Sequence, residues 1–508
     1  MVYKIEDQPI IGRQLFDVIT SGMYDNPLMI FREYIQNAVD SIDLGVSQGF
    51  LSLEESEISI QLQGQYRTIT IQDNGLGLSN ENAHIVLRSL GCSPKEGTSQ
   101  RGFRGIGRLG GLAYCDELIF ETRSSEVEPV AVITWDKRFF EKIVKETDRY
   151  VSLHETVENV SRSSLRPAEI SDPARFFRVI MKNVQRFHTD VLMNVKTVCD
   201  YLAQVAPVAY DNDKFRFTPL LVEHLSASLE YRCYNITVNG YQVKRPYTDT
   251  LKISTNINET INDVELFTFN DFDNNPIAVG WYAKTNFIAS LPNNLNSRGI
   301  RVRQGNIEIG DEHFLDDHFT ERRFASWQIG EIHVLNNRLK PNARRDGFEQ
   351  TADFERFLEQ ASLLGRHLSY LCRKSSNHRI AVVRVESVLQ KIGQLFANHI
   401  TYLNEEHYEL AKEQALKVLL QIEKVAMNGV PEDMKKRYTD LKETVEGKNH
   451  KPVYLESILD GRRLRKFDQK TLLTHVAKII ISSYEKSASA EDILQEIFTP
   501  FAKPTWQQ

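Results

Sequence analysis

The chain has 508 residues, which is too many for a single hydrophobic core and predicts about three domains. Hydrophobic residues make up 41% of the chain and charged residues 26%, so the composition excludes a largely disordered protein. The formal net charge of −6 at pH 7 argues against a chain-wide nucleic-acid-binding surface, although such an average can hide a local basic face.

The sequence also indicates where the protein works. The N-terminal run MVYKIEDQPIIGRQL lacks the apolar core and the cleavage site of a secretory signal. No stretch of about 18 uncharged apolar residues is present to span a bilayer. The cysteines are scattered without a CxxC pair, at Cys92, Cys115, Cys199, Cys233 and Cys372. We therefore expect a cytoplasmic protein with free thiols and no membrane partner.

Three regions follow one another along the chain. Residues 1–208 alternate between helical and strand patterns and predict a first α/β domain, with Pro207 near its end. Residues 209–375 mix short strand-like runs with helical ones and predict a second α/β domain. In residues 376–508 the apolar positions recur at helical spacing, which predicts a helical region suited to dimerisation or partner binding. The predicted fold class is α+β.

The first candidate site residues lie on a predicted helix that begins near Asn26. Glu33, Asn37 and Asp40 are four and three positions apart, so their side chains share one face of the helix. Most other positions are apolar, and a polar stripe on a buried helix is costly unless a polar group meets it. A cavity that holds a cation, water or phosphate would meet it; an ordinary surface face is the alternative.

A strand that ends at Asp73, within the run TITIQDNGLGLS, supplies the second candidate. Strand alternation places Asp73 on the same side as Ile69 and Ile71. A carboxylate directed into an apolar space can accept a hydrogen bond from an exocyclic amine, and Gly75 and Gly77 would let the backbone approach a flat ring. An Asp-Asn-Gly turn that ends a strand is the plain alternative.

A glycine-rich run follows at RGFRGIGRLGGL, residues 101–112. The backbone N–H groups of Gly102, Gly105 and Gly107 could surround phosphate oxygens, as glycine-rich loops do. The run is neither a Walker A loop nor a Rossmann fingerprint, because no GK[ST] follows and the spacing differs. The small polar residues before it, from 89 to 100, predict a mobile lid.

The strand ELIFETR places the Thr122 hydroxyl on the same face as Leu118 and Phe120. Thr122 therefore points into the same kind of apolar space as Asp73. A β-branched residue in a strand needs no functional reason, so this position alone leaves both interpretations open.

Taken together, IFREYIQNAVDSID, DNGLGLS and RGIGRLGGLAYCDELIFETR resemble the three nucleotide-binding motifs of the GHKL ATPases, most closely the HtpG-type heat-shock protein 90 chaperones. The resemblance implies an N-terminal GHKL, or Bergerat, α/β sandwich that binds ATP and Mg²⁺ and hydrolyses ATP. It also implies a homodimer that acts on a protein client or partner.

The resemblance assigns a role to each matched position. Glu33 would orient and deprotonate the attacking water, and Asn37 would bind the Mg²⁺ that bridges the phosphates. Asp73 would accept a hydrogen bond from the adenine amine, with Thr122 contributing through water. The other matches are Asp40 as the second acidic position of the helix, Gly77 beneath the adenine, and Gly105 and Gly107 in the phosphate loop.

A further match lies in LKPNARRDGFEQ, residues 339–350, which resembles the middle-domain loop of heat-shock protein 90. On that register Asn342 matches the loop asparagine, and Arg345 matches the arginine that reaches the γ-phosphate. Such an arginine stabilises charge in the transition state and makes hydrolysis depend on domain closure. Arg344 stands beside it, and the sequence alone leaves open which of the two side chains points inward.

The sequence departs from the family pattern at several places. Glu349 replaces the glutamine that follows the loop arginine, and Arg104 and Arg108 replace phenylalanines of the phosphate loop. The region from about residue 380 onward matches no part of the chaperones. These departures make the chain a divergent relative with a different C-terminal tail.

The leading functional hypothesis is an ATP-dependent chaperone or clamp, with lid closure and dimer rearrangement. The alternative is a DNA-associated GHKL ATPase of the MutL or microrchidia type. The tail and the arginines near the lid favour this alternative, whereas the acidic charge balance and the middle-domain loop oppose it. A histidine kinase is disfavoured because the sequence shows no phosphoacceptor helix or sensor segment.

Overall fold

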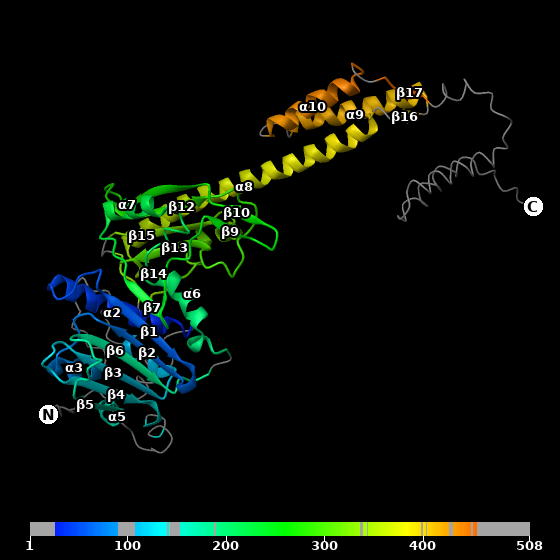
Figure 1. The fold of residues 1–508 in the computed structure, drawn as a ribbon. Coiled ribbons are helices and arrows are strands. Elements are labelled where there is room, and N and C mark those ends of the chain that lie inside the picture. The colour runs from blue at the N-terminus through cyan, green and yellow to red at the C-terminus, as the bar shows by residue number, and fades with distance from the viewer. Residues whose placement is uncertain are drawn as a thin grey trace, which may run out of the picture. The chain divides into compact units, whose positions relative to one another are not determined.

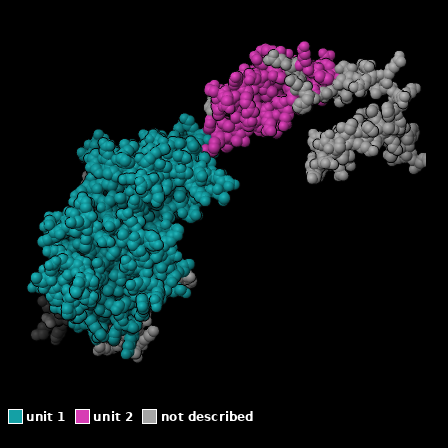
Figure 2. Space-filling model, viewed as in Figure 1, with its two compact units in different colours: residues 1–376 teal, residues 377–508 magenta. Residues whose placement is uncertain are grey.

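The computed structural model describes residues 26–89, 107–139, 142, 153–186, 189–335, 339–342, 344–397, 400–402, 404–425, 430–448 and 451–454, and Figure 1 shows its ribbon. The chain divides into two compact units, Met1–Ser376 and Asn377–Gln508 (Figure 2). The first unit contains mixed sheets and helices, and the described part of the second is mainly helical, which confirms the predicted α+β class. None of the described helices is long and apolar enough to cross a membrane.

Within the described residues, an eight-stranded sheet forms the base of the first unit, in the order β5-β4-β3-β6-β2-β1-β7-β8. Neighbouring strands are antiparallel except β1 and β7, which are parallel. The strands are β1 (Glu57–Gln63), β2 (Thr68–Asp73), β3 (Glu117–Arg123), β4 (Val130–Asp136), β5 (Ser161–Arg166), β6 (Phe176–Lys182), β7 (Asn235–Val238) and β8 (Tyr241–Gln242).

Helices cover one face of this sheet because their apolar sides share its core. Ile69 and Ile71 of β2 lie in one hydrophobic cluster with Ile35 and Ile42 of the helix α2. Burial alternates along β2 so that Asp73 is buried with the two isoleucines, as the alternation predicted. The helical elements of this lobe are α2 (Met29–Ser47), α3 (Asn80–Arg88), α5 (Leu153–Val160) and α6 (Val195–Val205), with 3-10 turns η1 (Gly64–Tyr66), η2 (Gly107–Ala113) and η3 (Val191–Met193).

A second sheet forms the middle lobe of the same unit, with five strands among the described residues in the order β11-β12-β15-β13-β14. Its strands are β11 (Asp263–Asn270), β12 (Pro276–Lys284), β13 (Gly299–Gln304), β14 (Ile307–Ile309) and β15 (Ile329–Val334). One face packs on α8 (Ala352–Leu395) through a cluster that includes Phe269 and Phe357. The other face packs on α7 (Thr218–Ser228) through a cluster that includes Trp281 and Leu221. The remaining elements are β9 (Thr250–Lys252), β10 (Asn258–Thr260), η4 (Asp316–His318) and η5 (Arg322–Trp327).

The strands do not follow the predicted domain limit at residue 208. After α7 has packed on the middle lobe, the chain returns to the first sheet, where Ile236 of β7 pairs in parallel with Ile58 of β1. The first sheet therefore takes its edge from residues beyond 208. The limits 1–208, 209–375 and 376–508 stay predictions, and the pairing of β7 with β1 extends the first sheet beyond residue 208.

Arginines of the middle lobe hold the last turn of α6. Arg303 Nη2 donates to the carbonyl of Gln204 at 2.6 Å, and Arg301 Nη2 donates to the Gln204 side-chain oxygen at 2.8 Å. The last carbonyls of a helix have no partner within the helix and carry partial negative charge. Positive groups at this point therefore stabilise the helix end and join the two lobes.

One of these arginines, Arg303, binds a buried carboxylate, Glu331. Its side chain is 0% exposed and lies 2.7 Å from Arg303 and 3.4 Å from Arg245. Tyr210 and Tyr247 donate to its two oxygens at 2.6 and 2.9 Å. Burial alone would raise the pKa of Glu331, but the two guanidiniums hold that pKa well below its usual value. The carboxylate therefore stays ionised inside the lobe.

The described part of the second unit consists of the end of α8, α9 (Glu405–Val425) and α10 (Glu432–Val445), with a small parallel pair β16 (Thr401–Tyr402) and β17 (Val453–Tyr454). One hydrophobic cluster fills it, and its members include Leu389, Leu419 and Tyr438. Arg437 of α10 makes two hydrogen bonds to Glu386 of α8 at 2.8 and 2.9 Å. This unit thus has a core of its own.

We predict that Glu331→Gln lowers the free energy of unfolding by about 3–5 kcal/mol, because Arg245 and Arg303 would then be buried without a counter-charge. Urea denaturation followed by tryptophan fluorescence measures the loss. Glu223→Gln is the matched control, since Glu223 is an exposed residue of α7 and the change is the same. Equal stability of the two variants would contradict the assigned role of Glu331.

Candidate functional site

The polar face of α2 is the first part of the candidate site. Eleven of the 19 positions of this helix are buried, including Phe31, Ile35 and Val39. Glu33 and Asn37 remain partly exposed on the side that the sequence predicted, and Asp40 is 2% exposed. A helix that is otherwise embedded in a core thus presents a carboxylate and an amide to an open side.

Asp73 occupies the end of β2 and is 3% exposed. Its Oδ1 accepts a hydrogen bond from the backbone N–H of Gly75 at 3.0 Å, which fixes the direction of the carboxylate. An ionised carboxylate has about four lone-pair sites, so it can accept several hydrogen bonds at once. The residue therefore fits the predicted role of an acceptor inside an apolar space.

The two glycines after Asp73 have a packing reason that the sequence did not reveal. A Cβ at Gly75 would lie 2.5 Å from Ser41 Oγ and 2.6 Å from the Ser41 carbonyl carbon of α2. Gly77 has a φ of +69°, and its Cβ would lie 2.2 Å from the carbonyl oxygen of Arg123. The sequence interpretation attributed both to a close approach to a ligand ring. In the structure, their small size lets the loop pack on the protein itself.

Thr122 is fully buried, and its hydroxyl joins the loop to the sheet. The hydroxyl donates to the carbonyl of Phe176 at 2.9 Å and accepts from the backbone N–H of Leu78 at 2.9 Å. Since the single hydroxyl hydrogen is already donated, a bridging water would have to donate to Thr122. The predicted water-mediated contact with adenine remains a prediction.

Part of the predicted phosphate loop, including Gly102 and Gly105, lies outside the described residues. Gly107 begins the 3-10 turn η2, and Tyr34 of α2 holds this turn. Tyr34 Oη donates to the carbonyl of Arg108 at 3.0 Å and accepts from the N–H of Gly111 at 3.0 Å. Sequence reasoning missed Tyr34, although a tyrosine on a buried helix usually needs a partner for its hydroxyl.

The middle-domain loop brings Arg345 to Glu33. Arg345 Nε lies 3.6 Å from Glu33 Oε1, and the two side chains are 11% and 14% exposed. Arg345 has a φ of +56°, a conformation that costs a residue with a side chain ~1–3 kcal/mol. A backbone hydrogen bond from Gly310 to the Arg345 carbonyl, 2.9 Å long, supports this conformation. Of the two adjacent arginines, Arg345 is therefore the one whose side chain reaches the polar face of α2.

Arg32 is a second residue that sequence reasoning missed. Its Nη2 donates to the carbonyl of Arg344 at 3.0 Å and its Nη1 donates to the carbonyl of Arg345 at 3.5 Å. The residue before Glu33 thus fixes the backbone of the loop that carries Arg345. Asn342 shapes the same loop, because its Nδ2 donates to Asp346 at 2.5 Å. Its Oδ1 is buried without a hydrogen-bond partner.

Comparison with known proteins gives one family match within the first lobe and several curated relatives. Residues 30–164 match the family described as histidine kinase-, DNA gyrase B-, and HSP90-like ATPase. A chaperone protein HtpG of Legionella pneumophila (strain Paris) is 28% identical over 176 residues, which cover 29% of this chain and 27% of the relative. HtpG of the Lens strain is 30% identical over 147 residues, covering 25% and 23%. HtpG of Coxiella burnetii is 26% identical over 210 residues, covering 36% and 32%.

These matches identify the class of protein. Residues 30–164 form an ATPase domain of the GHKL class, and α2, β2 and the turn η2 carry the motifs expected of it. Within that class, the similar proteins named above are HtpG chaperones of the heat-shock protein 90 family, at low identity. The chain spans about a third or less of their length.

The polar side chains on α2 are compatible with a nucleotide that carries its own metal ion. Among the described residues no group of three or more His, Cys, Asp or Glu side chains could hold a metal ion. Mg²⁺ is commonly held by one or two protein ligands together with substrate phosphates and waters. Asn37 beside Glu33 matches that requirement, because a single amide oxygen would need phosphate oxygens to complete the coordination. The residues present are thus compatible with Mg²⁺ that arrives with ATP.

We predict that Tyr34→Phe destabilises the first lobe by about 1–3 kcal/mol, because the buried N–H of Gly111 loses its acceptor. The variant should also bind ATP more weakly, since η2 borders the predicted phosphate loop. Urea denaturation and titration with a fluorescent ATP analogue measure the two effects. Tyr66→Phe is the control, because Tyr66 is 66% exposed. A Tyr34→Phe protein as stable as this control would refute the role of the hydroxyl.

Proposed function

We propose that the chain is an ATP-dependent, heat-shock-protein-90-like chaperone or clamp that hydrolyses ATP to ADP and phosphate. The observation that carries this proposal is the 3.6 Å approach of Arg345 to Glu33, which brings a middle-lobe arginine to the polar face of the ATPase domain. An arginine supplied from another lobe is a recurrent means of tying nucleotide hydrolysis to a conformational change.

Each residue contributes one part of the reaction. The Asp73 carboxylate would accept a hydrogen bond from the adenine amine and so position the nucleotide. Asn37 would hold Mg²⁺, which would supply positive charge against the phosphates. Glu33 accepts a proton from the water that attacks the γ-phosphorus, while the bond from that phosphorus to the bridging oxygen of ADP breaks. Arg345 stabilises the negative charge on the transferred group. Asp40, Gly75, Gly77, Gly107, Thr122 and Asn342 support these residues or the nucleotide.

The ion pair between Arg345 and Glu33 has a consequence for the order of events. While Arg345 faces Glu33, it competes with the water that Glu33 must orient. When ATP is bound, Arg345 has a more highly charged partner in the γ-phosphate. Hydrolysis therefore requires Arg345 to leave Glu33 and bind the γ-phosphate. In this way the rate of hydrolysis depends on the position of the middle lobe.

Lid closure, a homodimer that rearranges, a protein client and a cytoplasmic location are further parts of the proposal. They are supported by the similarity of part of this chain to HtpG chaperones. A DNA-associated ATPase of the MutL or microrchidia type remains the alternative, because the matched family also includes DNA gyrase B. The two functions differ in whether DNA changes the rate of hydrolysis.

We predict that the purified chain hydrolyses ATP, that Glu33→Ala abolishes this activity, and that double-stranded DNA does not change it. The physical reason is that removal of the carboxylate leaves the attacking water without a base. Steady-state phosphate release with Mg²⁺ measures all three results, and the Glu33→Ala protein serves as the blank for contaminating ATPases. Strong stimulation by DNA would overturn the chaperone-like proposal in favour of the DNA-associated alternative.

We predict that Arg345→Ala lowers kcat roughly 10²–10³-fold, as expected for the loss of one preorganised group that stabilises transition-state charge. Arg344→Ala is the matched control. Its side chain is replaced in the same loop, but its carbonyl still accepts the hydrogen bond from Arg32. ATP binding should persist in both variants, as measured by titration. Equal rates for Arg344→Ala and Arg345→Ala would show that the structure assigns the wrong arginine.

A further inference from the structure

Two neighbouring side chains of α2 have buried polar atoms that make no hydrogen bond. Gln36 is 1% exposed, and in the described part of the chain neither its Nε2 nor its Oε1 has a hydrogen-bond partner. Arg32, one helical turn earlier, is 3% exposed, and its buried Nε is likewise without a partner. Buried polar groups are nearly always paired, so three unmatched atoms on adjacent turns of one helix require an explanation.

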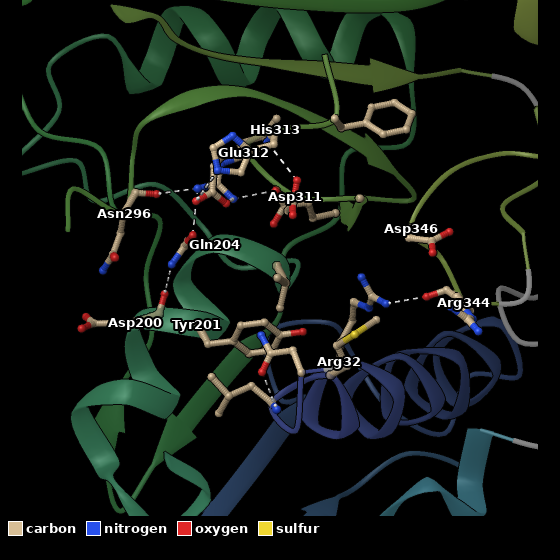
Figure 3. A pocket seen from close by; sticks show the side chains of 18 of the residues that line it. Arg32, Asp200, Tyr201, Gln204, Asn296, Asp311, Glu312, His313, Arg344 and Asp346 are labelled. Carbon is tan, nitrogen blue, oxygen red and sulfur yellow. Dashed lines mark hydrogen bonds and ion pairs between the residues drawn. The ribbon is translucent and has the colours of Figure 1, made fainter. Parts of the chain in front are cut away.

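The contact of Arg32 with the middle-domain loop explains the unmatched Nε. Arg32 reaches from α2 to this loop, where its Nη2 donates to the carbonyl of Arg344 at 3.0 Å (Figure 3). Its Nη1 donates to the carbonyl of Arg345 at 3.5 Å. The two terminal nitrogens thus hold the guanidinium on the loop, and in this position the Nε finds no acceptor.

Gln36 is complementary to Arg32. The two residues are four positions apart on α2, so their side chains are neighbours on one face of the helix. Side chains on a helix lean toward its N-terminus, which directs Gln36 over the turn that carries Arg32. The Nε of an arginine is a donor and the Oε1 of a glutamine is an acceptor. One hydrogen bond between them would therefore satisfy both atoms.

We propose that Gln36 is an alternative partner of Arg32 and that the exchange between the two partners regulates release of the middle-domain loop. In the observed arrangement Arg32 binds the loop carbonyls and three buried atoms stay unmatched. In the other arrangement Arg32 turns back to Gln36, which satisfies two of these atoms and lowers the cost of releasing the loop. A cavity of ≈ 640 Å³, which Arg32 and Arg344 line, leaves space for this change.

The exchange bears on the candidate site because the same loop carries Arg345. While Arg32 holds the loop, Arg345 lies 3.6 Å from Glu33. In the proposed mechanism Arg345 leaves Glu33 for the γ-phosphate, and the loop moves with it. Gln36 is then a positioning residue that acts through Arg32 and makes this movement easier. That effect on hydrolysis rests on the proposed function, whereas the exchange of partners by Arg32 does not.

Hydrogen exchange of the full chain without nucleotide tests the exchange of partners. The amide of Gly310 reports on the loop, because it donates to the Arg345 carbonyl at 2.9 Å and exchanges when this contact opens. Gln36→Met keeps the size of the side chain but removes the alternative partner, so exchange at Gly310 should slow roughly tenfold. Gln36→Glu offers Arg32 a stronger acceptor, so exchange at Gly310 should become faster by a similar factor.

Gln390→Met is the control, because it makes the same substitution at an exposed position of α8. Its Gly310 amide should exchange as in the unaltered chain. Opposite effects of Gln36→Met and Gln36→Glu would support the proposal. An equal or faster rate in Gln36→Met, as loss of a well-packed side chain would cause, would overturn it. An unchanged or slower rate in Gln36→Glu would overturn it as well.

Steady-state phosphate release tests the effect on hydrolysis. The kcat of Gln36→Met should be roughly tenfold lower than that of the unaltered chain, with unchanged affinity for ATP, because the variant holds the loop more firmly and keeps the nucleotide contacts. An unchanged kcat would overturn the regulation of hydrolysis by Gln36. If the unaltered chain hydrolyses no ATP but the opposite exchange effects are observed, the proposed function fails and the exchange of partners by Arg32 stands.

Discussion

The hold of the middle lobe on the C-terminal turn of α6 is the interaction on which the candidate site depends. Arg301 and Arg303 bind Gln204 at 2.8 and 2.6 Å, where a helix presents unpaired carbonyls and partial negative charge. This contact fixes one lobe against the other close to α2. Without a fixed lobe, a flexible arginine side chain on a surface loop would spend little time within 3.6 Å of Glu33. The position of Arg345 beside Glu33 thus depends on the contact between the two lobes.

That hold requires a buried counter-charge. Arg303 and Arg245 lie 2.7 and 3.4 Å from the fully buried Glu331. Replacing such a cluster by apolar residues is often neutral for stability, whereas removing one member is strongly destabilising. The main effect of the cluster is therefore to orient its side chains and not to add stability. It orients the guanidinium of Arg303 so that Nε binds Glu331 and Nη2 binds the carbonyl of Gln204 at the helix end.

Much of the candidate site was predictable because it follows the periods of helix and strand. The spacing of Glu33 and Asn37 placed them on one face of α2, and alternation placed Asp73 with the buried isoleucines. Tyr34 and Arg32 were not predicted, since their partners lie 74 and 312 residues away along the chain. The return of β7 to the first sheet escaped prediction for the same reason. The periodicity of a helix or strand identifies which side chains share a face. It does not identify which distant residues contact that face.

The backbone of Arg345 links these observations to function. A positive φ at a residue with a side chain persists only where the surroundings enforce it, and here Arg32, Asn342 and Gly310 all bind the loop backbone. The carbonyls of Arg344 and Arg345 are held from both lobes, by the side chain of Arg32 and by the backbone N–H of Gly310. In the proposed mechanism, a small change in lobe position would decide whether Arg345 faces Glu33 or a phosphate. Under that proposal, the contacts around the loop would control hydrolysis as much as the arginine itself.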